Sequence, residues 1–492
     1  MTTPDITVAD PTTETPAAPL RCDLFIDGEW RSGSGGRRFD VVDPSDGSVI
    51  AGFAVATDAD CQAAVDAAVA AQEGWAATAP RARSELLRAA YDVLTAEVEH
   101  FAELMVRENG KSWSDAIGEA TYAKEFFRWF AEEAVRVPGD YRLSPAGDKR
   151  IVVDRQPIGV SLLITPWNFP AAMATRKLAP ALAAGCTTIL KPARETPLTA
   201  AYVVDVLHRV GVPRGVVNLV TPVPTGPLVK AMLDRPEVRK LSFTGSTEVG
   251  RELLHACADS VVSAAMELGG NAPLIVLPGA DLDVAVEGAL LAKMRNGGSA
   301  CTAANRFYVH GSLHDEFVAR MGDALGRVRV GPGLDRGNGL GALVSVWERD
   351  KVADLVAGAV AEGATVVRGG RSSAEGAFYD ATLVTGVRHG SAINATEIFG
   401  PVTAVVRYDD VDDAVRMAND TIYGLMAYVF GEEREAMAVA SRLEAGMVAV
   451  NRGVVSDPAA PFGGVKQSGL GREGSSEGIL EFLEEKYIAL TA

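Results

Sequence analysis

The sequence predicts an α/β protein with two doubly wound domains and a small additional arm. Three observations lead to this fold class. From Val160 onward, short apolar runs alternate with helix-length segments, and a second alternation of the same kind begins at Ala272. Strands that alternate with helices form parallel sheets covered by helices. The length of 492 residues also exceeds what one hydrophobic core usually holds.

The chain before the first alternation contains two kinds of segment. Residues 1–20 are rich in Thr, Pro, Ala and Asp and lack the basic start and apolar run of a signal peptide, so we expect a disordered tail. Residues from about 60 to 134 are rich in Ala, Glu and Arg, with apolar residues at helical spacing. This pattern predicts ordinary amphipathic helices.

The first alternation predicts the strands of a parallel sheet. Helices are expected through Ala184 and to about Val210, between strands at residues 160–164, 187–190, 216–220 and 241–243. Sheets of this kind bind ligands beyond the carboxyl ends of their strands.

The second alternation predicts another α/β domain, with strands at residues 272–277, 365–367, 403–406 and 447–450. One further strand, at 148–156 ahead of Pro157, interrupts the first half of the chain. We interpret this short strand as an arm to another subunit.

Composition excludes several classes of function. The formal net charge of −17 argues against a nucleic-acid partner, which needs a basic face, but not against an anionic substrate in a local basic pocket. Five scattered cysteines without CxxC spacing indicate reduced thiols, and with only six histidines no metal site is expected. No apolar stretch predicts a membrane span, so we expect a cytoplasmic protein.

Three motifs follow predicted strands of the first sheet. In residues 164–170, two prolines flank Asn168, which is either a simple turn residue or an amide fixed toward a crevice. Lys191 follows the next strand and is placed to bind a ribose or phosphate. Residues 243–250 would expose N–H groups at a helix start, suited to pyrophosphate, although this is not the GxGxxG fingerprint; Ser246 is equally compatible with a plain N-cap.

Two more motifs place reactive side chains beside glycine pairs. Glu267 precedes Gly269-Gly270, as in a surface turn or a mobile base. Cys301 follows Gly297-Gly298. Free cysteines are usually buried and inert, but the glycines allow backbone and substrate to approach this thiol closely.

These five motifs, with residues 397–401 and 461–464, closely resemble the aldehyde dehydrogenase superfamily in order and spacing. The resemblance covers about Phe25 to Tyr487. Within the superfamily, the chain is most similar to the succinate-semialdehyde dehydrogenases, through residues 156–160, 165–173, 240–247, 267–273 and 469–475.

The resemblance implies an aldehyde dehydrogenase-like fold of two Rossmann-type α/β domains plus a small oligomerisation arm. The implied parts are a cofactor-binding domain (21–140 and 160–266), the arm (141–159 and 477–492), a catalytic domain (267–450) and a return segment lining the active site (451–476).

The resemblance also implies roles for individual residues. Cys301 matches the nucleophile, Glu267 the general base, and Asn168, with the backbone N–H of Cys301, the oxyanion hole. Lys177 and Glu473 match positions linked to proton relay. The positions that match cofactor contacts are Thr165, Pro166, Trp167, Lys191, Ala193, Arg194, Phe243, Gly245, Ser246, Val249, Leu268, Glu397 and Phe399.

Three further positions match the pocket for the distal carboxylate of succinate semialdehyde: Arg176, Arg295 and Ser456. Arginine suits this task because its planar fork of donors matches a carboxylate, although a solvated or ion-paired arginine is the ordinary alternative. Glutarate semialdehyde, one methylene longer, is the alternative substrate. A catalytically silent relative is the alternative outside the enzyme class.

The cofactor and the assembly are expectations of the same kind. Arg194 stands where NAD-preferring relatives often carry a Glu that binds ribose hydroxyls, and an Arg there can pair with a 2′-phosphate. The sequence therefore favours NADP over NAD. We expect a small anionic aldehyde as substrate and a homodimer or homotetramer as the assembly.

Overall fold

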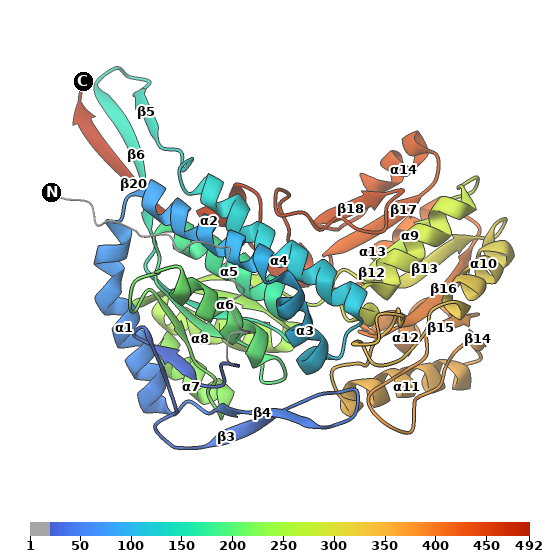
Figure 1. The fold of residues 1–492 in the computed structure, drawn as a ribbon. Helices are drawn as coiled ribbons and strands as arrows, with labels where there is room; N and C mark the ends of the chain where they lie inside the picture. Colours follow the sequence, from blue (N-terminus) through green and yellow to red (C-terminus); the bar gives the residue numbers. More distant parts are fainter. Residues whose placement is uncertain (1–19) are drawn as a thin grey trace.

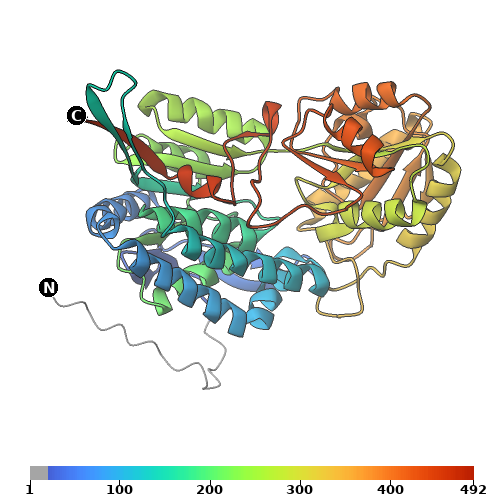
Figure 2. The same cartoon turned by 90° about the horizontal axis from the view of Figure 1, so that it is seen from above.

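The computed structural model describes residues 20–492. The predicted tail lies outside the described residues except for Leu20. Two sheets, each between layers of helices, lie side by side, and a narrow strand arm projects from the N-terminal half (Figures 1 and 2). The predicted fold class, two α/β units and an arm, is confirmed.

The N-terminal sheet has eight strands in the order β19-β11-β10-β7-β8-β9-β1-β2. Its five central strands, from β11 to β9, are parallel, and the outer strands pair antiparallel with them. The bounds are β1 Leu24–Ile26, β2 Glu29–Arg31, β7 Val160–Ile164, β8 Thr188–Lys191, β9 Val217–Leu219, β10 Val238–Thr244, β11 Ser263–Glu267 and β19 Gly469–Leu470.

Helices cover both faces of this sheet and bury a separate apolar core on each side. Helices α2 to α6 pack on one face, and α1, α7 and α8 on the other. All fifteen residues of α5 are buried, since α4 packs over it. The bounds are α1 Asp58–Ala76, α2 Pro80–Ala96, α3 Val98–Asn109, α4 Trp113–Glu133, α5 Pro170–Ala184, α6 Pro197–Arg209, α7 Thr225–Leu233 and α8 Thr247–Ser260.

The second sheet has seven strands in the order β14-β15-β16-β13-β12-β17-β18, all parallel except the edge strand β14. The strand bounds are β12 Ala272–Val276, β13 Ala304–His310, β14 Thr365–Arg368, β15 Thr382–Thr385, β16 Val402–Tyr408, β17 Met426–Phe430 and β18 Met447–Val450. The helix bounds are α9 Leu282–Met294, α10 His314–Gly326, α11 Val346–Ala361, α12 Ala392–Ala395, α13 Val411–Asn419 and α14 Glu433–Ala440.

The arm is a three-stranded antiparallel sheet of β5 (Asp140–Leu143), β6 (Lys149–Pro157) and β20 (Leu483–Thr491). β6 and β20 pair along their whole length, which ties the C-terminus to the middle of the chain. Large apolar side chains on the arm are exposed, among them Tyr141 and Tyr487. The remaining elements are a hairpin of β3 (Arg38–Val42) and β4 (Val49–Ala54), the short helix α15 (Glu477–Leu480), and the 3-10 turns η1 (Arg295–Gly298) and η2 (Lys466–Ser468).

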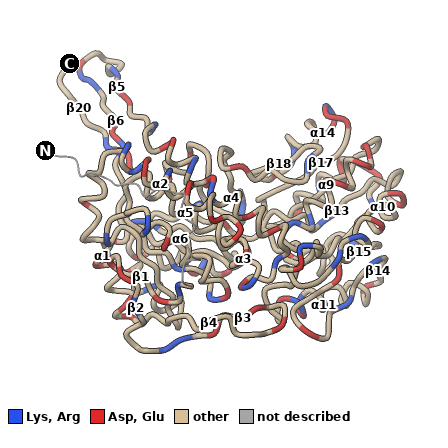
Figure 3. Tube along the Cα trace, viewed as in Figure 1, with Lys and Arg blue, Asp and Glu red and all other residues tan. Residues whose placement is uncertain are grey.

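Charged residues of both signs are spread over the described chain (Figure 3). Lysines and arginines alternate with acidic residues over both halves of the described chain (Figure 3). None of the described helices combines the length and apolarity needed to cross a bilayer. All five cysteines are free thiols.

Candidate active site

The loops that carry the predicted motifs follow strands of the N-terminal sheet, and these strands end at the same level. Hydrogen-bonded register places Lys191, Ile164, Phe243 and Met266 side by side on β8, β7, β10 and β11. The residues that follow them therefore emerge along one carboxyl edge, where parallel sheets bind ligands. Register explains why motifs far apart in the sequence meet.

A cavity of about 220 Å³ opens at this edge and is lined by residues of both halves of the chain. Twelve of the predicted site residues line it: Pro166, Trp167, Asn168, Arg176, Gly245, Ser246, Leu268, Arg295, Cys301, Glu397, Phe399 and Ser456.

The other nine predicted residues do not line this cavity. Lys177, Glu267 and Glu473 are buried. Thr165, Ala193 and Phe243 are buried near the strand ends, and Lys191 is half-buried there. Arg194 and Val249 are exposed; the Arg194 guanidinium lies 5.2 Å from the ring centroid of Phe39 on the β3–β4 hairpin.

The loop that carries the thiol has an unusual backbone. Asn296, Gly297 and Gly298 have φ values of 55°, 59° and 75°, in the left-handed region. A side chain on Gly298 would lie 2.2 Å from the carbonyl oxygen of Gly400. Glycine adopts left-handed backbone easily and has no Cβ that would clash with a neighbouring segment. The glycines thus accommodate neighbouring backbone and turn partly exposed Cys301 into the cavity.

Glu267 is brought to the same place from the other side. It ends β11, and the chain then passes so close to the nucleophile loop that a side chain on Gly270 would lie 2.2 Å from the carbonyl oxygen of Cys301. The Glu267 carboxyl is buried, and its Oε2 makes no hydrogen bond. Burial and the nearby Glu473 carboxylate raise the pKa of Glu267 well above 4.5. A carboxylate whose pKa is raised is a stronger base than an ordinary glutamate.

The same surroundings hold Cys301 as a thiol at rest. Burial, and then the Glu267 and Glu397 carboxylates, raise the pKa of Cys301 to about 12. The guanidinium groups of Arg176 and Arg295 act in the opposite direction and lower it. The thiolate is the reactive form, so these charges control nucleophilicity.

Asn168 faces the nucleophile loop from the strand end of β7. Its Nδ2 donates to the carbonyl oxygen of Ser299 at 3.0 Å. An amide NH₂ has two hydrogens, so this bond leaves one donor for the cavity that Asn168 and Cys301 both line.

The two cavity arginines have different neighbours. Arg176 is buried, with Nη1 3.6 Å from Oε2 of Glu473, and it also bonds the hydroxyl of Tyr122. Arg295 donates to Oγ of Ser456 at 2.9 Å, and no carboxylate of the described residues lies within 4.0 Å of it. Glu473 also forms an ion pair with Lys177.

At the carboxyl edge of the N-terminal sheet, the N-terminus of helix α8 can bind an anion. The first N–H groups of α5 and α6 are bonded by buried Glu119 and Glu108, respectively. At α8 only its own Ser246 accepts, from the N–H of Val249 at 3.4 Å, and Ser246 lines the cavity. Helix N-termini bind phosphate groups. Together with the buried, unbonded Oγ1 of Thr244 beside it, this edge fits the pyrophosphate of a dinucleotide.

Glu397 and Lys191 complete that edge. Glu397 lines the cavity, accepts from the N–H of Gly270 at 3.1 Å, and burial raises its pKa to about 7. Burial lowers the pKa of Lys191 to about 8. The ring of Phe399 packs edge-on against Trp167 at 5.3 Å between centroids. No group of three or more His, Cys, Asp or Glu residues in the described chain is arranged to hold a metal ion.

Several cavity residues had no signal strong enough to identify them from the sequence. Phe169 and Phe462 lie inside the quoted motifs, but an aromatic residue in a turn is ordinary. Tyr122 is one of many apolar positions on a long helix. The lining residues missed in this way are Tyr122, Phe169, Met173, Thr244, Gly269, Ala300, Thr302, Glu348, Lys351 and Phe462.

The chain is similar in sequence and fold to known proteins. The family model described as "Aldehyde dehydrogenase family" matches residues 30–488. A succinate-semialdehyde dehydrogenase of Paenarthrobacter nicotinovorans is 48% identical over 90% of this chain and 99% of its own. A glutarate-semialdehyde dehydrogenase of Pseudomonas putida is 43% identical over 96% and 98%. The crystal structure of an E. coli NADP-dependent enzyme superposes with a TM-score of 0.94, at 42% identity over 96% of this chain and 98% of the other.

Proposed function

The chain belongs to the aldehyde dehydrogenase family, and we propose that it oxidises succinate semialdehyde to succinate with NADP or NAD. One observation carries the choice of substrate: the reactive Cys301 and the cation of Arg295 line the same cavity. A cation that forms no ion pair within 4.0 Å, next to a nucleophile, suits an aldehyde that carries its own carboxylate.

In the proposed first half-reaction, the Cys301 thiol loses its proton to solvent water, the resulting thiolate attacks the aldehyde carbon, and the carbonyl electron pair moves to oxygen. The free hydrogen of Asn168 Nδ2 and the backbone N–H of Cys301 stabilise this oxyanion. One such donor is typically worth about 3–4 kcal/mol in the transition state. The bound nicotinamide supplies the acceptor for the hydride that leaves the former aldehyde carbon. The acyl group then remains on sulfur as a thioester.

In the second half-reaction, Glu267 removes a proton from water, whose oxygen attacks the thioester carbon. The carbon–sulfur bond breaks, the carboxylic acid leaves, and the thiolate returns. The raised pKa of Glu267 suits a base that must accept a proton near neutral pH. Glu473, which is bonded to Lys177, lies beside Glu267 and is proposed to pass that proton onward with this lysine.

Residues of the carboxyl edge are proposed to hold the cofactor. The start of α8 at Ser246 would take the pyrophosphate, Lys191 and Glu397 the riboses, and Phe399 the nicotinamide. Exposed Arg194 supports NADP as the preferred form, because its charge can pair with a 2′-phosphate. The E. coli enzyme whose structure superposes on this chain is NADP-dependent.

Glutarate semialdehyde remains the second candidate substrate, because a relative of that name is nearly as similar. One methylene in a pocket is worth only about 1–3 kcal/mol. The proposal also includes a cytoplasmic location and a homodimer or homotetramer. The exposed apolar side chains of the arm, such as Leu143 and Leu490, support assembly with a second copy.

A steady-state panel tests the proposal: succinate semialdehyde, glutarate semialdehyde and butanal, each with NADP and with NAD. We expect kcat/KM for the anionic aldehydes to exceed that for butanal by roughly 10- to 100-fold, from a charged hydrogen bond worth about 1.5–3 kcal/mol. Cys301→Ala should abolish turnover without changing cofactor affinity. Equal kcat/KM for butanal, or an active Cys301→Ala variant, would contradict the proposal.

A further inference from the structure

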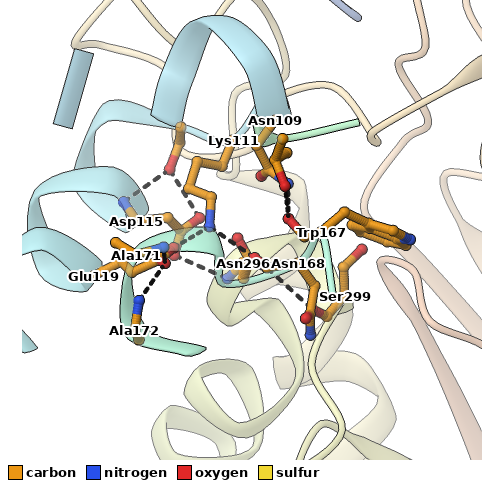
Figure 4. Close-up of polar contacts among 12 residues, drawn as sticks. Asn109, Lys111, Asp115, Glu119, Trp167, Asn168, Ala171, Ala172, Asn296 and Ser299 are labelled. Carbon is orange, nitrogen blue, oxygen red and sulfur yellow. Dashed lines mark hydrogen bonds and ion pairs between the residues drawn. The ribbon is translucent and has the colours of Figure 1, made fainter. Parts of the chain in front are cut away.

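Helix α4 and the turn before it reach the active site with buried charges that the proposed chemistry does not use. Lys111 and Glu119 form an ion pair, and each is at most 3% exposed. Figure 4 shows these side chains pointing toward the chain around Asn168. Asp115, on the same segment, faces the nucleophile loop.

The polar atoms of this ion pair form hydrogen bonds with the backbone around Asn168. Lys111 Nζ donates to the carbonyl oxygen of Asn168 at 2.9 Å. Glu119 Oε1 accepts from the N–H groups of Ala171 and Ala172, at 2.9 and 3.1 Å, in the first turn of α5. The backbone on both sides of the Asn168 amide is thereby fixed by charged side chains.

A second set of contacts ties the nucleophile loop to the same atoms. Asn296 Nδ2 donates to the carbonyl oxygens of Asn168 at 2.8 Å and Ser299 at 3.0 Å. The N–H of Asn296, whose φ is 55°, donates to Asp115 Oδ1 at 2.9 Å. The carbonyl oxygen of Asn168 thus accepts from Lys111 and Asn296 together, and the carbonyl oxygen of Ser299 from Asn168 and Asn296.

Stability alone does not account for this arrangement. A buried ion pair loses the solvation of both ions, and apolar residues of the same size often stabilise a fold equally well. Its distinctive contribution is geometric, since charge-assisted hydrogen bonds hold their partners more tightly than neutral ones. Here the partners are the segment that carries the oxyanion donor and, through Asn296, the loop that carries the thiol.

We infer that Lys111, Glu119, Asp115 and Asn296 are positioning residues that aim the free hydrogen of Asn168 Nδ2 at the oxygen of the reacting aldehyde. This inference rests on the proposed function. Displacement of such a donor costs up to about 100-fold in rate.

The chain offers a matched control in Glu108. It is as buried as Glu119, and it likewise accepts from two N–H groups at a helix start, those of Leu198 and Thr199 on α6. It makes no hydrogen bond to residues 168 or 295–301. Burial raises the pKa of Glu108 to about 8, so Glu108→Gln changes its hydrogen bonds rather than its charge near neutral pH, and it perturbs a helix start without touching the oxyanion donor.

The test compares two reactions of the same thiol in the full-length protein. Hydride transfer, followed as the single-turnover burst of reduced cofactor with succinate semialdehyde, passes through an oxyanion. Alkylation by iodoacetamide forms a carbon–sulfur bond with loss of iodide and needs no oxyanion donor. The variant Lys111→Met/Glu119→Gln removes both charges of the pair, so no buried charge is left alone. Asn296→Gly removes the second donor, and glycine tolerates the left-handed backbone there.

We expect both variants to slow the burst roughly 10- to 100-fold and to change the alkylation rate less than twofold. In an Asn168→Ala background, neither should slow the burst further, because the donor they position is gone. Glu108→Gln should change burst and alkylation by the same factor.

The inference is contradicted if burst and alkylation fall together, if neither falls, or if the losses add to that of Asn168→Ala. If Lys111→Met/Glu119→Gln does not fold, the same criteria are applied to Asn296→Gly alone. A wild-type protein that forms no reduced cofactor from succinate semialdehyde in a single turnover would contradict the proposed function. A wild-type burst with unaffected variants would contradict only the positioning role.

Discussion

The two arginines of the cavity differ in the charge of the side chains that contact them. Around Arg176, on α5, the charges are paired: Glu473 lies between Arg176 and Lys177, and Glu267 lies nearby. Around Arg295 the direct contacts are neutral, namely the hydroxyl of Ser456 and the rings of Phe169 and Tyr122, and the Asp115 carboxylate interacts with it without forming an ion pair within 4.0 Å. The first region therefore resembles a reaction centre with internally balanced charge, whereas the second presents its charge to the ligand.

This difference assigns separate tasks to residues that looked equivalent. A carboxylate that enters the cavity gains more from Arg295, since Arg176 already shares its charge with Glu473. Arg176 instead influences the reacting groups: among the cations, its guanidinium is the stronger influence that lowers the pKa of Cys301. The predictions below separate binding effects from chemical effects.

The largest effect is expected for Glu267→Gln in the paired region. Without the base, the thioester is not hydrolysed, and general-base catalysis is typically worth about 10²–10⁴-fold. Steady turnover should fall by that factor while the first burst of reduced cofactor remains, which stopped-flow absorbance measures. Normal steady turnover would exclude Glu267 as the required base.

Arg295→Ala comes next and tests the region with the unpaired charge. Loss of one charge-assisted hydrogen bond, about 1.5–3 kcal/mol, should raise KM for succinate semialdehyde roughly 10- to 100-fold. Butanal kinetics, measured in the same assay, should stay nearly unchanged because butanal has no carboxylate. If both substrates suffer equally, Arg295 is structural, and the choice of succinate semialdehyde loses its support.

Arg176→Ala should raise KM for succinate semialdehyde by a smaller factor than Arg295→Ala, because its charge is shared with Glu473. Unlike Arg295→Ala, it should also lower kcat for butanal, since the group beside Glu473 is lost. Steady-state kinetics with the two aldehydes measures both effects. A KM effect larger than that of Arg295→Ala, with butanal unaffected, would reverse the comparison.

The smallest expected effect concerns the pH dependence of Cys301 alkylation. Because the pKa of Cys301 is raised to about 12, the thiolate fraction of the cofactor-free protein increases with pH throughout the neutral range. Iodoacetamide alkylation should therefore accelerate by about tenfold per pH unit from pH 7 to 9 without a plateau. Arg176→Ala should slow alkylation more than Arg295→Ala does. A plateau below pH 8 would contradict the protonated resting thiol.

Much of this site could be predicted from the sequence, because strand ends and motifs coincide. The strand at 160–164 was predicted with the bounds that the structure has, and parallel register then fixes the level at which Asn168, Lys191 and Ser246 emerge. The short strands β1 to β4 were not predicted. β1 joins the sheet through a single register pair with β9, Phe25 to Leu219, far along the chain.

The buried charges next to the site could not be predicted from the sequence. Lys111 and Glu119 occur among helices rich in charged residues, where a lysine or glutamate normally indicates a solvated face. The packing of α4 on α5 buries Glu119, and Lys111, in the turn before α4, is buried against the chain at Asn168. Likewise, the pairing of Arg176 with Glu473 joins residues from distant parts of the chain, so the sequence could not distinguish it from Arg295.

The most direct test of the whole account is to trap the acyl group. Glu267→Gln is mixed with succinate semialdehyde and NADP, quenched with acid, digested and analysed by mass spectrometry. The account predicts a succinyl group in thioester linkage on Cys301, in an amount equal to the burst of reduced cofactor, and none in Cys301→Ala. A full burst without an acyl group on Cys301 would contradict covalent catalysis through this residue.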